Sequence, residues 1–389
     1  MIEVDERCTG CTACMTICHT NAISMQSDNK GFEIPKIDNE LCVNCEMCVS
    51  VCPKETSEYG FNNPVSAYAM KTKDEETRTI STSGGAFSVL YNYFISAGGV
   101  VYGVMHDSEF NVIHNRAEDS NTCMKMHGSK YVQSRMGDSI SKVINDIRNN
   151  RMVLFTGTPC QIDGLLNCIE MLGEKADLLY TCQIICHGVP SPRIWKDHLR
   201  FIEQVREKRI LKYIHRPKDY GWHEHNEKVI FEDGSFESQS KLSQNFKDLF
   251  YLGYSLRDCC FNCKYAGMAG RADFTIGDFW GVETIIPSID DNKGTSIVFV
   301  NSSRGEEILS MCKKEYYSNE VSFKDAIMYN HKKPSRRPED VEIFWEDYLK
   351  NGYEYVVRKY AGYHIPKRIL YRFKKILRRF LVKHKVIGH

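Results

Sequence analysis

Long uncharged apolar stretches are absent from this sequence of 389 residues. None approaches the roughly 20 residues that a membrane-spanning helix needs. The N-terminus, MIEVDERC, also lacks the basic and apolar segments of a secretory signal. With 42% hydrophobic and 26% charged residues, the composition is that of a soluble protein with room for two or three domains. We therefore expect a cytoplasmic protein.

Nucleotide-binding fingerprints are absent too. The chain has neither G-x-G-x-x-G nor G-x4-G-K-[ST], so no Rossmann or P-loop motif supports nucleotide binding. Strand-like runs nevertheless alternate with helical patterns after residue 79, which favours an α/β domain. The expected strands span residues 100–105, 151–157 and 177–186, and the expected helices span residues 139–150 and 159–172.

Cysteine is abundant, with 17 residues. Because no secretory signal accompanies them, tight C-x2-C spacings favour metal ligation over disulfides. Cys123, Cys168 and Cys312 stand apart from the others. We expect these three to be small buried hydrophobic side chains.

Two cysteine runs occupy the N-terminal segment. The first is Cys8-x2-Cys11-x2-Cys14-x3-Cys18, and the second is Cys42-x2-Cys45-x2-Cys48-x3-Cys52-Pro53. Three cysteines at two-residue intervals wrap one 4Fe–4S cube, and the fourth reaches the other cube. We assign Cys8, Cys11, Cys14 and Cys52 to cluster 1, and Cys42, Cys45, Cys48 and Cys18 to cluster 2. Zinc is the alternative, but zinc sites use pairs of C-x2-C, not triple runs.

This segment resembles the bacterial two-cluster ferredoxins, including Asn-Ala-Ile at residues 21–23. It departs from them at His19, where proline is usual; an N–H at this position can change the potential of the neighbouring cluster. We predict an α+β ferredoxin domain at residues 1–56, a polar and charged linker at 57–78, and an α/β oxidoreductase domain at 79–300. Residues 301–389 are expected to be helical. The α/β domain is expected to have an N-terminal part (79–150) and a C-terminal part (151–300).

Several short pieces recur in order after the ferredoxin segment. They are STSGGAFSVL (81–90), GSKYVQS (128–134), GTPCQ (157–161), CHGVPSP (186–192) and DCCFNCKYAGMAGRADFTIGDFWG (258–281). In this order they resemble the beta-subunit family of coenzyme F420 hydrogenases and dehydrogenases, over residues 1 to about 300. The resemblance implies an α/β domain that binds FAD beside a further 4Fe–4S cluster. It also implies an acceptor such as a deazaflavin coenzyme or a biosynthetic intermediate.

Four thiols fit the further cluster: Cys160, Cys186, Cys260 and Cys263. The family pattern selects Cys260 over Cys259, because its ligand follows Arg257 by three residues, and Cys182 is the alternative ligand. Flavin contacts are expected from a set of polar and glycine residues. They are Ser83, Gly84, Gly85, Lys130, Tyr131, Ser134, Thr158 and Asp278.

Each of these flavin contacts also has a plain structural interpretation. Ser83-Gly84-Gly85 precedes a helical pattern, so its amides can receive a phosphate or simply cap and pack the helix. Lys130 can face a diphosphate or a reduced flavin, with Tyr131 stacking, or lie on a surface strand. Asp273 and Asp278 can bond flavin or ribose hydroxyls, but an Asp at a strand end is more often a turn or cap residue. His223 and His225 have metal-ligand spacing without an evident third ligand, so we interpret them as surface or substrate-side residues.

The net charge of +1 conceals an asymmetry. Residues 351–389 hold 11 Lys or Arg and one acid, which gives +10, so the remainder has 40 − 49, or −9. Residues 366–385 place apolar side chains at helical spacing opposite basic ones. Such a basic amphipathic tail can bind an anionic membrane surface or a protein partner, or can dock on the acidic body. Nucleic acid is not expected.

The sequence thus predicts an iron–sulfur flavoprotein oxidoreductase. Electrons would pass between a low-potential one-electron carrier, such as a ferredoxin-type protein, and a two-electron acceptor. No catalytic acid or base is evident. The alternatives are a true deazaflavin-dependent enzyme, a non-catalytic electron-transfer subunit that docks on a larger complex, and an assembly or regulatory protein with structural clusters.

Overall fold

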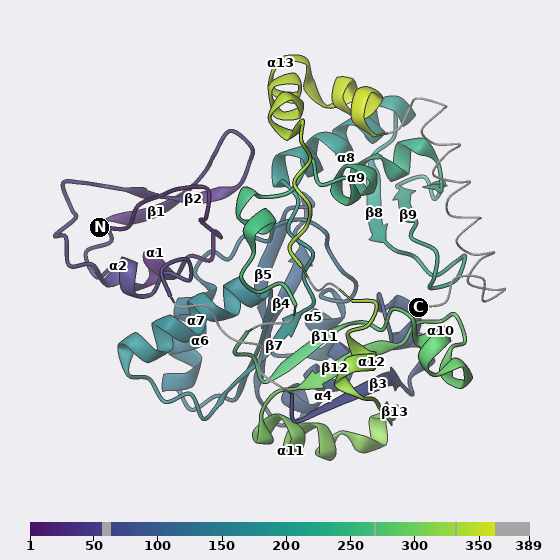
Figure 1. Ribbon diagram of the computed structural model, residues 1–389, viewed down its shortest axis with the longest axis horizontal. Coiled ribbons are helices and arrows are strands. Elements are labelled where there is room, and N and C mark those ends of the chain that lie inside the picture. The colour runs from purple at the N-terminus through teal and green to yellow at the C-terminus, as the bar shows by residue number, and fades with distance from the viewer. Residues whose placement is uncertain (57–63, 268–269, 331–332, 362–389) are drawn as a thin grey trace.

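The N-terminal cysteine runs form two matching loops in the computed structural model, which describes residues 1–56, 64–267, 270–330 and 333–361 (Figure 1). A short helix ends each loop, α1 (Ala13–Ile17) and α2 (Met47–Ser50). Left-handed backbone occurs at the same positions of both loops: Gly10 and Thr12 in the first, Asn44 and Glu46 in the second. Single left-handed residues are uncommon outside glycine, so the shared pattern indicates two copies of one loop. A hairpin of β1 (Ile23–Ser27) and β2 (Glu33–Ile37) completes this segment.

An eight-stranded sheet is the centre of the remaining chain, in the order β13-β3-β12-β11-β7-β6-β4-β5. Four neighbouring strands are parallel, namely β4 (Val100–His106), β6 (Val153–Gly157), β7 (Leu179–Ile184) and β11 (Phe274–Asp278). The other four pair antiparallel: β3 (Ser66–Thr72), β5 (Val112–Ala117), β12 (Ser296–Val300) and β13 (Tyr316–Glu320). The three strands expected from the sequence are confirmed, and the short apolar runs reflect burial on both faces.

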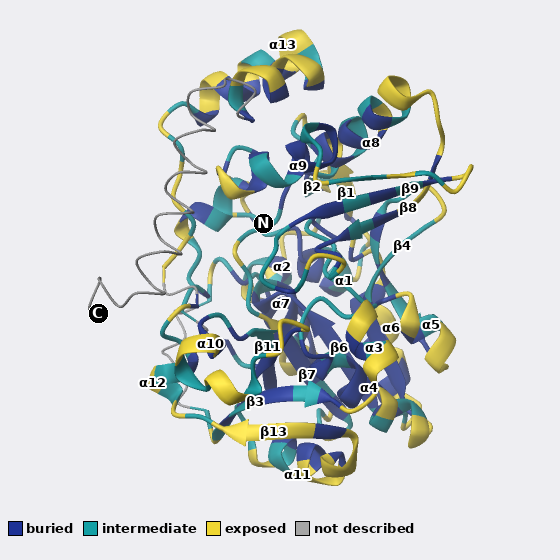
Figure 2. Cartoon of the chain, turned by 90° about the vertical axis from the view of Figure 1, so that its right-hand side faces the viewer, coloured by how far each residue is buried: buried dark blue, intermediate teal, exposed yellow. Residues whose placement is uncertain are grey.

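Helices cover both faces of this sheet. Along β6, Val153 and Phe155 face a core beneath α6 (Ser139–Arg148) and α7 (Pro159–Leu172), whereas Leu154 faces α4 (Ala86–Ser96) and α11 (Ser303–Met311). Both expected helices are confirmed. Figure 2 shows the inner strands buried, while the edge strand β13 is mostly exposed.

A precise start and stop fix α7. Thr158 and Gln161 form a reciprocal capping box, Pro159 opens the first turn, and Gly173 closes the helix with left-handed backbone. The cap holds Cys160 in the first turn. Residues of α1 pack on α6 and α7, and Ile17 and Val51 share one apolar core with Leu165. The ferredoxin segment is thus built into the body of the protein.

A smaller layer is inserted between β7 and β11. It combines α8 (Pro192–Arg206) and α9 (Lys241–Tyr251) with a three-stranded sheet, and α13 (Val341–Tyr360) packs on it from the end of the described chain (Figure 1). His198 lies buried between the hydroxyls of Tyr353 (2.8 Å) and Tyr213 (3.1 Å). The strands of the smaller layer are β8 (Ile210–His215), β9 (Glu227–Phe231) and β10 (Phe236–Ser238). The short helices of the molecule are α3 (Glu75–Ile80), α5 (Ser120–Met124), α10 (Val282–Ile285), α12 (Phe323–Ala326), η1 (Asp258–Asn262), η2 (Pro287–Ile289) and η3 (Lys313–Glu315).

The predicted domain limits need correction. Within the expected linker 57–78, β3 pairs with both β12 and β13, and Asp74 caps α3. The expected boundary at residue 300 is also wrong, because β13 belongs to the same sheet, and β4 pairs with β6 across the expected division at 150. The charge-dense sequence 71–78 was misleading because it covers the end of β3, a turn and the start of α3, and its Thr72 and Arg78 are buried. The expected tail, 366–385, lies outside the described residues.

Candidate functional site

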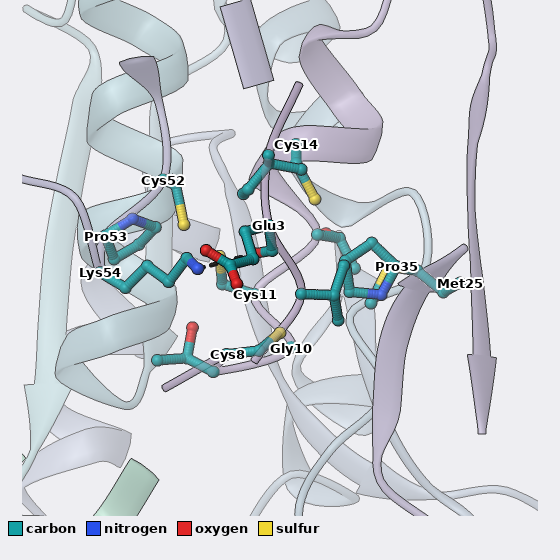
Figure 3. Close-up of a pocket in the computed structure, with 14 residues that line it drawn as sticks. Glu3, Cys8, Gly10, Cys11, Cys14, Met25, Pro35, Cys52, Pro53 and Lys54 are labelled. Atoms are coloured by element: carbon teal, nitrogen blue, oxygen red, sulfur yellow. Dashed lines mark hydrogen bonds between the residues drawn. The ribbon is translucent and has the colours of Figure 1, made fainter. Parts of the chain in front are cut away.

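Four cysteines from both N-terminal runs line one pocket. Cys8, Cys11 and Cys14 come from the first loop, and Cys52 comes from the end of the second run; Figure 3 shows their sulfur atoms around the pocket. Burial raises the pKa values of Cys11 and Cys14, and the neighbouring thiols raise them further. Burial raises the pKa of Cys52 to about 11. Four converging cysteine thiols fit the ligand requirement of a 4Fe–4S cube.

The other four N-terminal cysteines lie closer to the solvent. Cys48 is buried, Cys42 and Cys18 are half-buried, and Cys45 is exposed. The pKa of Cys18 is lowered, because hydrogen bonds from Thr20 and the Ala22 backbone outweigh the opposing effect of burial. Donors of this kind stabilise a thiolate and hence a cluster ligand.

A second group of thiols lies in the α/β domain. Cys160 begins α7, Cys186 follows β7, and Cys263 follows η1. Burial, followed by the thiol of Cys259 and then those of Cys186 and Cys263, raises the pKa of Cys160. Burial is also the main cause that raises the pKa of Cys186 to about 12, with Cys263 and Cys259 adding to it. The structure thus brings these three regions of the chain together.

The adjacent pair Cys259 and Cys260 separates in this group. Cys259 is an electrostatic neighbour of Cys160, Cys186 and Cys263. The β-carbon of Cys260 instead lies 3.1 Å from the position that a β-carbon on Gly188 would occupy. The alternative ligand Cys182 is buried in the core on the α4 side of the sheet. Cys123, Cys168 and Cys312 are buried, as expected.

Residues expected to contact flavin, such as Thr158 and Asp278, lie along one edge of the large sheet. This edge holds the carboxyl ends of β6, β7 and β11, and Cys160 and Cys186 lie just beyond it. Because β12 and β3 run antiparallel to their neighbours, their joined ends at Ser296 and Met70 belong to the same edge. The carboxyl edge of an open α/β sheet is where such folds bind ligands.

Direct contacts connect these residues. Thr158 Oγ1 lies 3.2 Å from Cys160 Sγ, and Gln161 donates to Ser134 Oγ at 3.0 Å. At the other end of the edge, Arg216 donates to Asp278 and, at 3.4 Å, to the hydroxyl of Tyr131. Residues 128–134 form this connection without a regular strand, so the surface-strand interpretation of that segment is wrong.

Three expected flavin contacts already have partners within the protein. The Gly84 amide donates to Ser296 Oγ at 2.9 Å, and Ser83 donates to the Thr295 carbonyl at 2.8 Å. Lys130 Nζ donates to the carbonyls of Lys125 and His127. A β-carbon on Gly84 would lie 2.2 Å from the Met70 carbonyl oxygen. These glycines therefore permit close packing of α4 against the sheet edge.

Buried donors without a partner point to a polar ligand at this edge. Among the described residues, Arg216 Nε and Thr295 Oγ1 are buried and make no hydrogen bond. Lys218 donates to the carbonyls of Arg78 and Ser83, and burial, followed by the Arg78 charge, lowers its pKa to about 7. The unpaired donors of Arg216 and Thr295 suit an oxygen-rich ligand such as a flavin with its diphosphate. Sequence reasoning missed Arg216 and Lys218, since HRPKDYGW carries no motif.

The remaining candidates have other surroundings. Asp273 accepts hydrogen bonds from the Thr181 amide and from Arg304, which is a structural role. His225 lies 2.7 Å from the Tyr251 hydroxyl. His223 lies 2.9 Å from Asp290, and Glu283 is close enough for the three to offer ligand atoms within 4.8 Å of one another. The structure thus groups His223 with two carboxylates that lie 60 and 67 residues later in the sequence, and His225 is not one of the three.

Comparisons with known proteins match both parts of the chain. Residues 150–325 match the family described as the C-terminal part of the coenzyme F420 hydrogenase/dehydrogenase beta subunit, and residues 7–56 match the 4Fe–4S dicluster domain. The region 150–325 belongs to this hydrogenase and dehydrogenase beta-subunit family. Its N-terminal segment is a 4Fe–4S dicluster ferredoxin domain, which confirms the resemblance inferred from the cysteine runs.

Two individual proteins are similar to this chain. Ferredoxin-3 of Chlorobaculum tepidum is 42% identical over 60 residues, which cover 14% of this chain and 89% of that ferredoxin. A solved structure, a xenon derivative of the F420-reducing [NiFe] hydrogenase complex from Methanosarcina barkeri, is 16% identical with a TM-score of 0.43. The match covers 78% of this chain and 95% of the chain in that structure.

The two matched regions contain the cysteines described above. The ferredoxin match includes all eight N-terminal ones, and the match to the hydrogenase family includes Cys160, Cys186 and the pair at 259–260 with Cys263. The chain is therefore an iron–sulfur protein of an oxidoreductase family. Over the parts of the chain that the structure describes, no helix is both long enough and apolar enough to cross a membrane.

Proposed function

We propose that this protein is an iron–sulfur flavoprotein oxidoreductase with three 4Fe–4S clusters and one FAD. It exchanges single electrons with a low-potential carrier protein and paired electrons with a deazaflavin coenzyme or a biosynthetic substrate. The family description, which names coenzyme F420, supports the deazaflavin. Iron–sulfur clusters carry one electron at a time, and a flavin supplies the conversion to two-electron chemistry.

One observation carries the proposal. The thiols of Cys160, Cys186 and Cys263 gather beside a ligand-binding edge of the sheet that also holds unpaired buried donors. A thiol group alone would suit a structural metal, and a polar edge alone would suit any small ligand. Their adjacency supports an iron–sulfur cluster next to a flavin, because electrons move efficiently only between close cofactors.

The ligands proposed for the two ferredoxin clusters follow the crossed pattern. Cys8, Cys11, Cys14 and Cys52 hold cluster 1, and Cys42, Cys45, Cys48 and Cys18 hold cluster 2. The shared pocket of the first four supports the crossing, since Cys52 is the most distant of them in sequence.

For cluster 3, we propose Cys160, Cys186 and Cys263 with one thiol of the adjacent pair. The C-x2-C spacing supports Cys260, whereas the electrostatic contacts support Cys259. Parallel Cys259→Ser and Cys260→Ser variants identify the ligand, because the ligand variant loses one cluster and the other retains three.

The residues proposed to hold the flavin are those of the sheet edge. Arg216 and Lys218 supply cationic donors for the diphosphate or the reduced ring. Hydrogen bonds to Tyr131 and Asp278 orient Arg216, and hydrogen bonds to the carbonyls of Arg78 and Ser83 orient Lys218. Trp280 stacks under the Arg216 guanidinium at 4.8 Å from its ring centre and limits water access to it. Ser134 and Thr158 connect this edge to Cys160.

Iron, sulfide and flavin content of anaerobically purified protein tests the proposal. Three cubes correspond to about twelve irons per chain, together with one FAD. Cys160→Ser should lower the iron to about eight and reduce flavin retention, whereas Cys168→Ser, a buried cysteine outside the group, should change neither. About eight irons and no flavin in the wild-type chain, even after reconstitution, would instead indicate a non-catalytic electron-transfer subunit.

A further inference from the structure

We propose that a rigid junction, made by Gly164, Arg257 and Lys264, holds cluster 1 against cluster 3, so that cluster 1 alone connects the ferredoxin domain with the α/β domain. Cluster 2 then faces the external carrier. This inference rests on the proposed function, since it requires cluster 3. Three separate contacts carry it. Each joins the first cysteine run, or the end of the second run at Cys52, to a residue close in sequence to a proposed ligand of cluster 3.

The first contact crosses α7. A β-carbon on Gly164 would lie 2.8 Å from Cys11 Sγ and 3.2 Å from Cys11 Cβ, so only glycine lets the loop approach this closely. Cys160 precedes Gly164 by four residues, and residues four apart lie on the same face of a helix. The same face of α7 therefore carries one proposed ligand of cluster 3 and the contact with one of cluster 1.

The second contact is a buried arginine. Arg257 is 4% exposed and donates to the Cys8 carbonyl at 2.6 Å, the Glu33 carbonyl at 3.0 Å and Gln133 Oε1 at 2.7 Å. Gln133 in turn donates to the Thr9 carbonyl at 2.9 Å. Cys259 and Cys260 follow Arg257 by two and three residues. One guanidinium thus binds the backbone of the first loop beside the η1 thiols.

The third contact involves the residue after Cys263. Lys264 Nζ donates to the carbonyls of Pro53 and Thr56, and to Thr56 Oγ1 at 2.9 Å. Pro53 follows Cys52. Tyr265, next in sequence, donates to the buried Asp163 on α7. Burial and Asp163, followed by Cys160 and then Cys11, raise the pKa of Tyr265, so its ring has cysteines of both groups as neighbours.

The start of the second loop instead faces the solvent. Its Leu41 and Val43 are 50% and 61% exposed, and Cys45 is exposed. Clusters held at these places would supply one-electron transfer between neighbouring cubes. The proposed series of clusters therefore has its inner side at Cys11 and its outer side at Cys45.

Magnetic coupling between reduced clusters tests this order without reference to activity. Dithionite-reduced protein should show an electron paramagnetic resonance spectrum broadened by neighbouring clusters. In Cys45→Ser, which lacks cluster 2, the broadening between clusters 1 and 3 should persist. In Cys11→Ser, which lacks cluster 1, the coupling of cluster 3 should be lost. The reverse pattern would overturn the inference.

The junction residues are then tested in the Cys45→Ser background. Gly164→Val should displace the first loop and abolish the coupling at unchanged iron content, whereas Met171→Val, at an exposed position of the same helix, should not. Because Gly164→Val can also prevent folding, Lys264→Glu provides a second test: its carboxylate faces the Pro53 and Thr56 oxygens and Asp163. Lys264→Arg should keep the coupling.

Two failures are distinguishable. A wild-type chain that binds no more iron than Cys160→Ser overturns cluster 3 and the junction with it. A chain that loses iron in Cys160→Ser, yet keeps its coupling in both Gly164→Val and Lys264→Glu, overturns only the junction.

Discussion

Replacing Arg257 with methionine should loosen the ferredoxin domain without removing a cluster ligand. The change keeps an apolar stem but leaves three acceptors, the carbonyls of Cys8 and Glu33 and the side chain of Gln133, without their charged donor. Phe32 also loses the cation 5.3 Å from its ring centre. Arg257 is 4% exposed, so solvent does not screen these contacts in the native state.

The magnitude follows from the three hydrogen bonds. Each bond to a charged group contributes about 1.5–3 kcal/mol, and water that enters the opened junction replaces part of this, so we expect a loss of about 3 kcal/mol. At about 1.4 kcal/mol per factor of ten, the opening equilibrium of the junction should rise by roughly 100-fold.

Amide hydrogen exchange measures this opening locally, which suits a protein whose global unfolding would release its clusters irreversibly. Peptides covering residues 8–17 and 128–136 should lose protection in Arg257→Met. Arg257→Lys should restore only part, because a point charge cannot span three acceptors. Arg193→Met, which removes one exposed bond to the Asn29 carbonyl, is the matched control and should have little effect. Protection in Arg257→Met equal to that of the wild type would refute the junction argument.

Three further predictions concern other parts of the chain. Cys52→Ser should damage the cluster of Cys8, Cys11 and Cys14, seen by Mössbauer or paramagnetic resonance spectroscopy, and damage to the cluster of Cys42 instead would contradict the crossed ligation. Since the folded chain holds Lys218 with a pKa of about 7 against an ordinary 10.5, it binds fewer protons than the unfolded chain in that window, so stability should rise with pH there; Lys218→Met should flatten the rise in thermal midpoints, and an unchanged slope would contradict it. Deleting residues 366–389 should abolish sedimentation with anionic vesicles while iron content stays constant, and unchanged sedimentation would exclude the membrane interaction.

The elements that could be predicted from the sequence are those with strong local patterns. Val, Ile and Leu runs gave β4, β6 and β7, and the Thr-Pro start with a closing glycine gave α7. β3 was missed because its sequence, SAYAMKT, is half small or polar and leads into a charged turn. A strand of this kind acquires its identity from its partners β12 and β13, which come more than 200 residues later.

The site divides in the same way. The spacing of cysteines is local, so the eight N-terminal thiols and the C-x2-C at 260–263 could be recognised directly. Arg257 served only to select Cys260, and Lys264 was not singled out. The contacts of both residues could not be expected, because their partners at Cys8 and Pro53 are 249 and 211 residues away. Only the fold relates such pairs. The choice between Cys259 and Cys260 likewise depends on which side of η1 faces α7.

The shared core gives a physical reason for fusing a ferredoxin to this domain. A domain tethered only by a flexible linker would have to find its docking surface before each electron transfer, at an effective concentration set by the linker. Here Ile17 and Val51 are buried in one core with Leu165, so separation would expose apolar surface on both sides. The contact between Cys11 and Gly164 is therefore permanent in the folded protein, and transfer across it no longer depends on a docking equilibrium. The second loop has the opposite requirement. Cys45 must stay exposed, because its side of the protein is the one left for a carrier that binds and leaves.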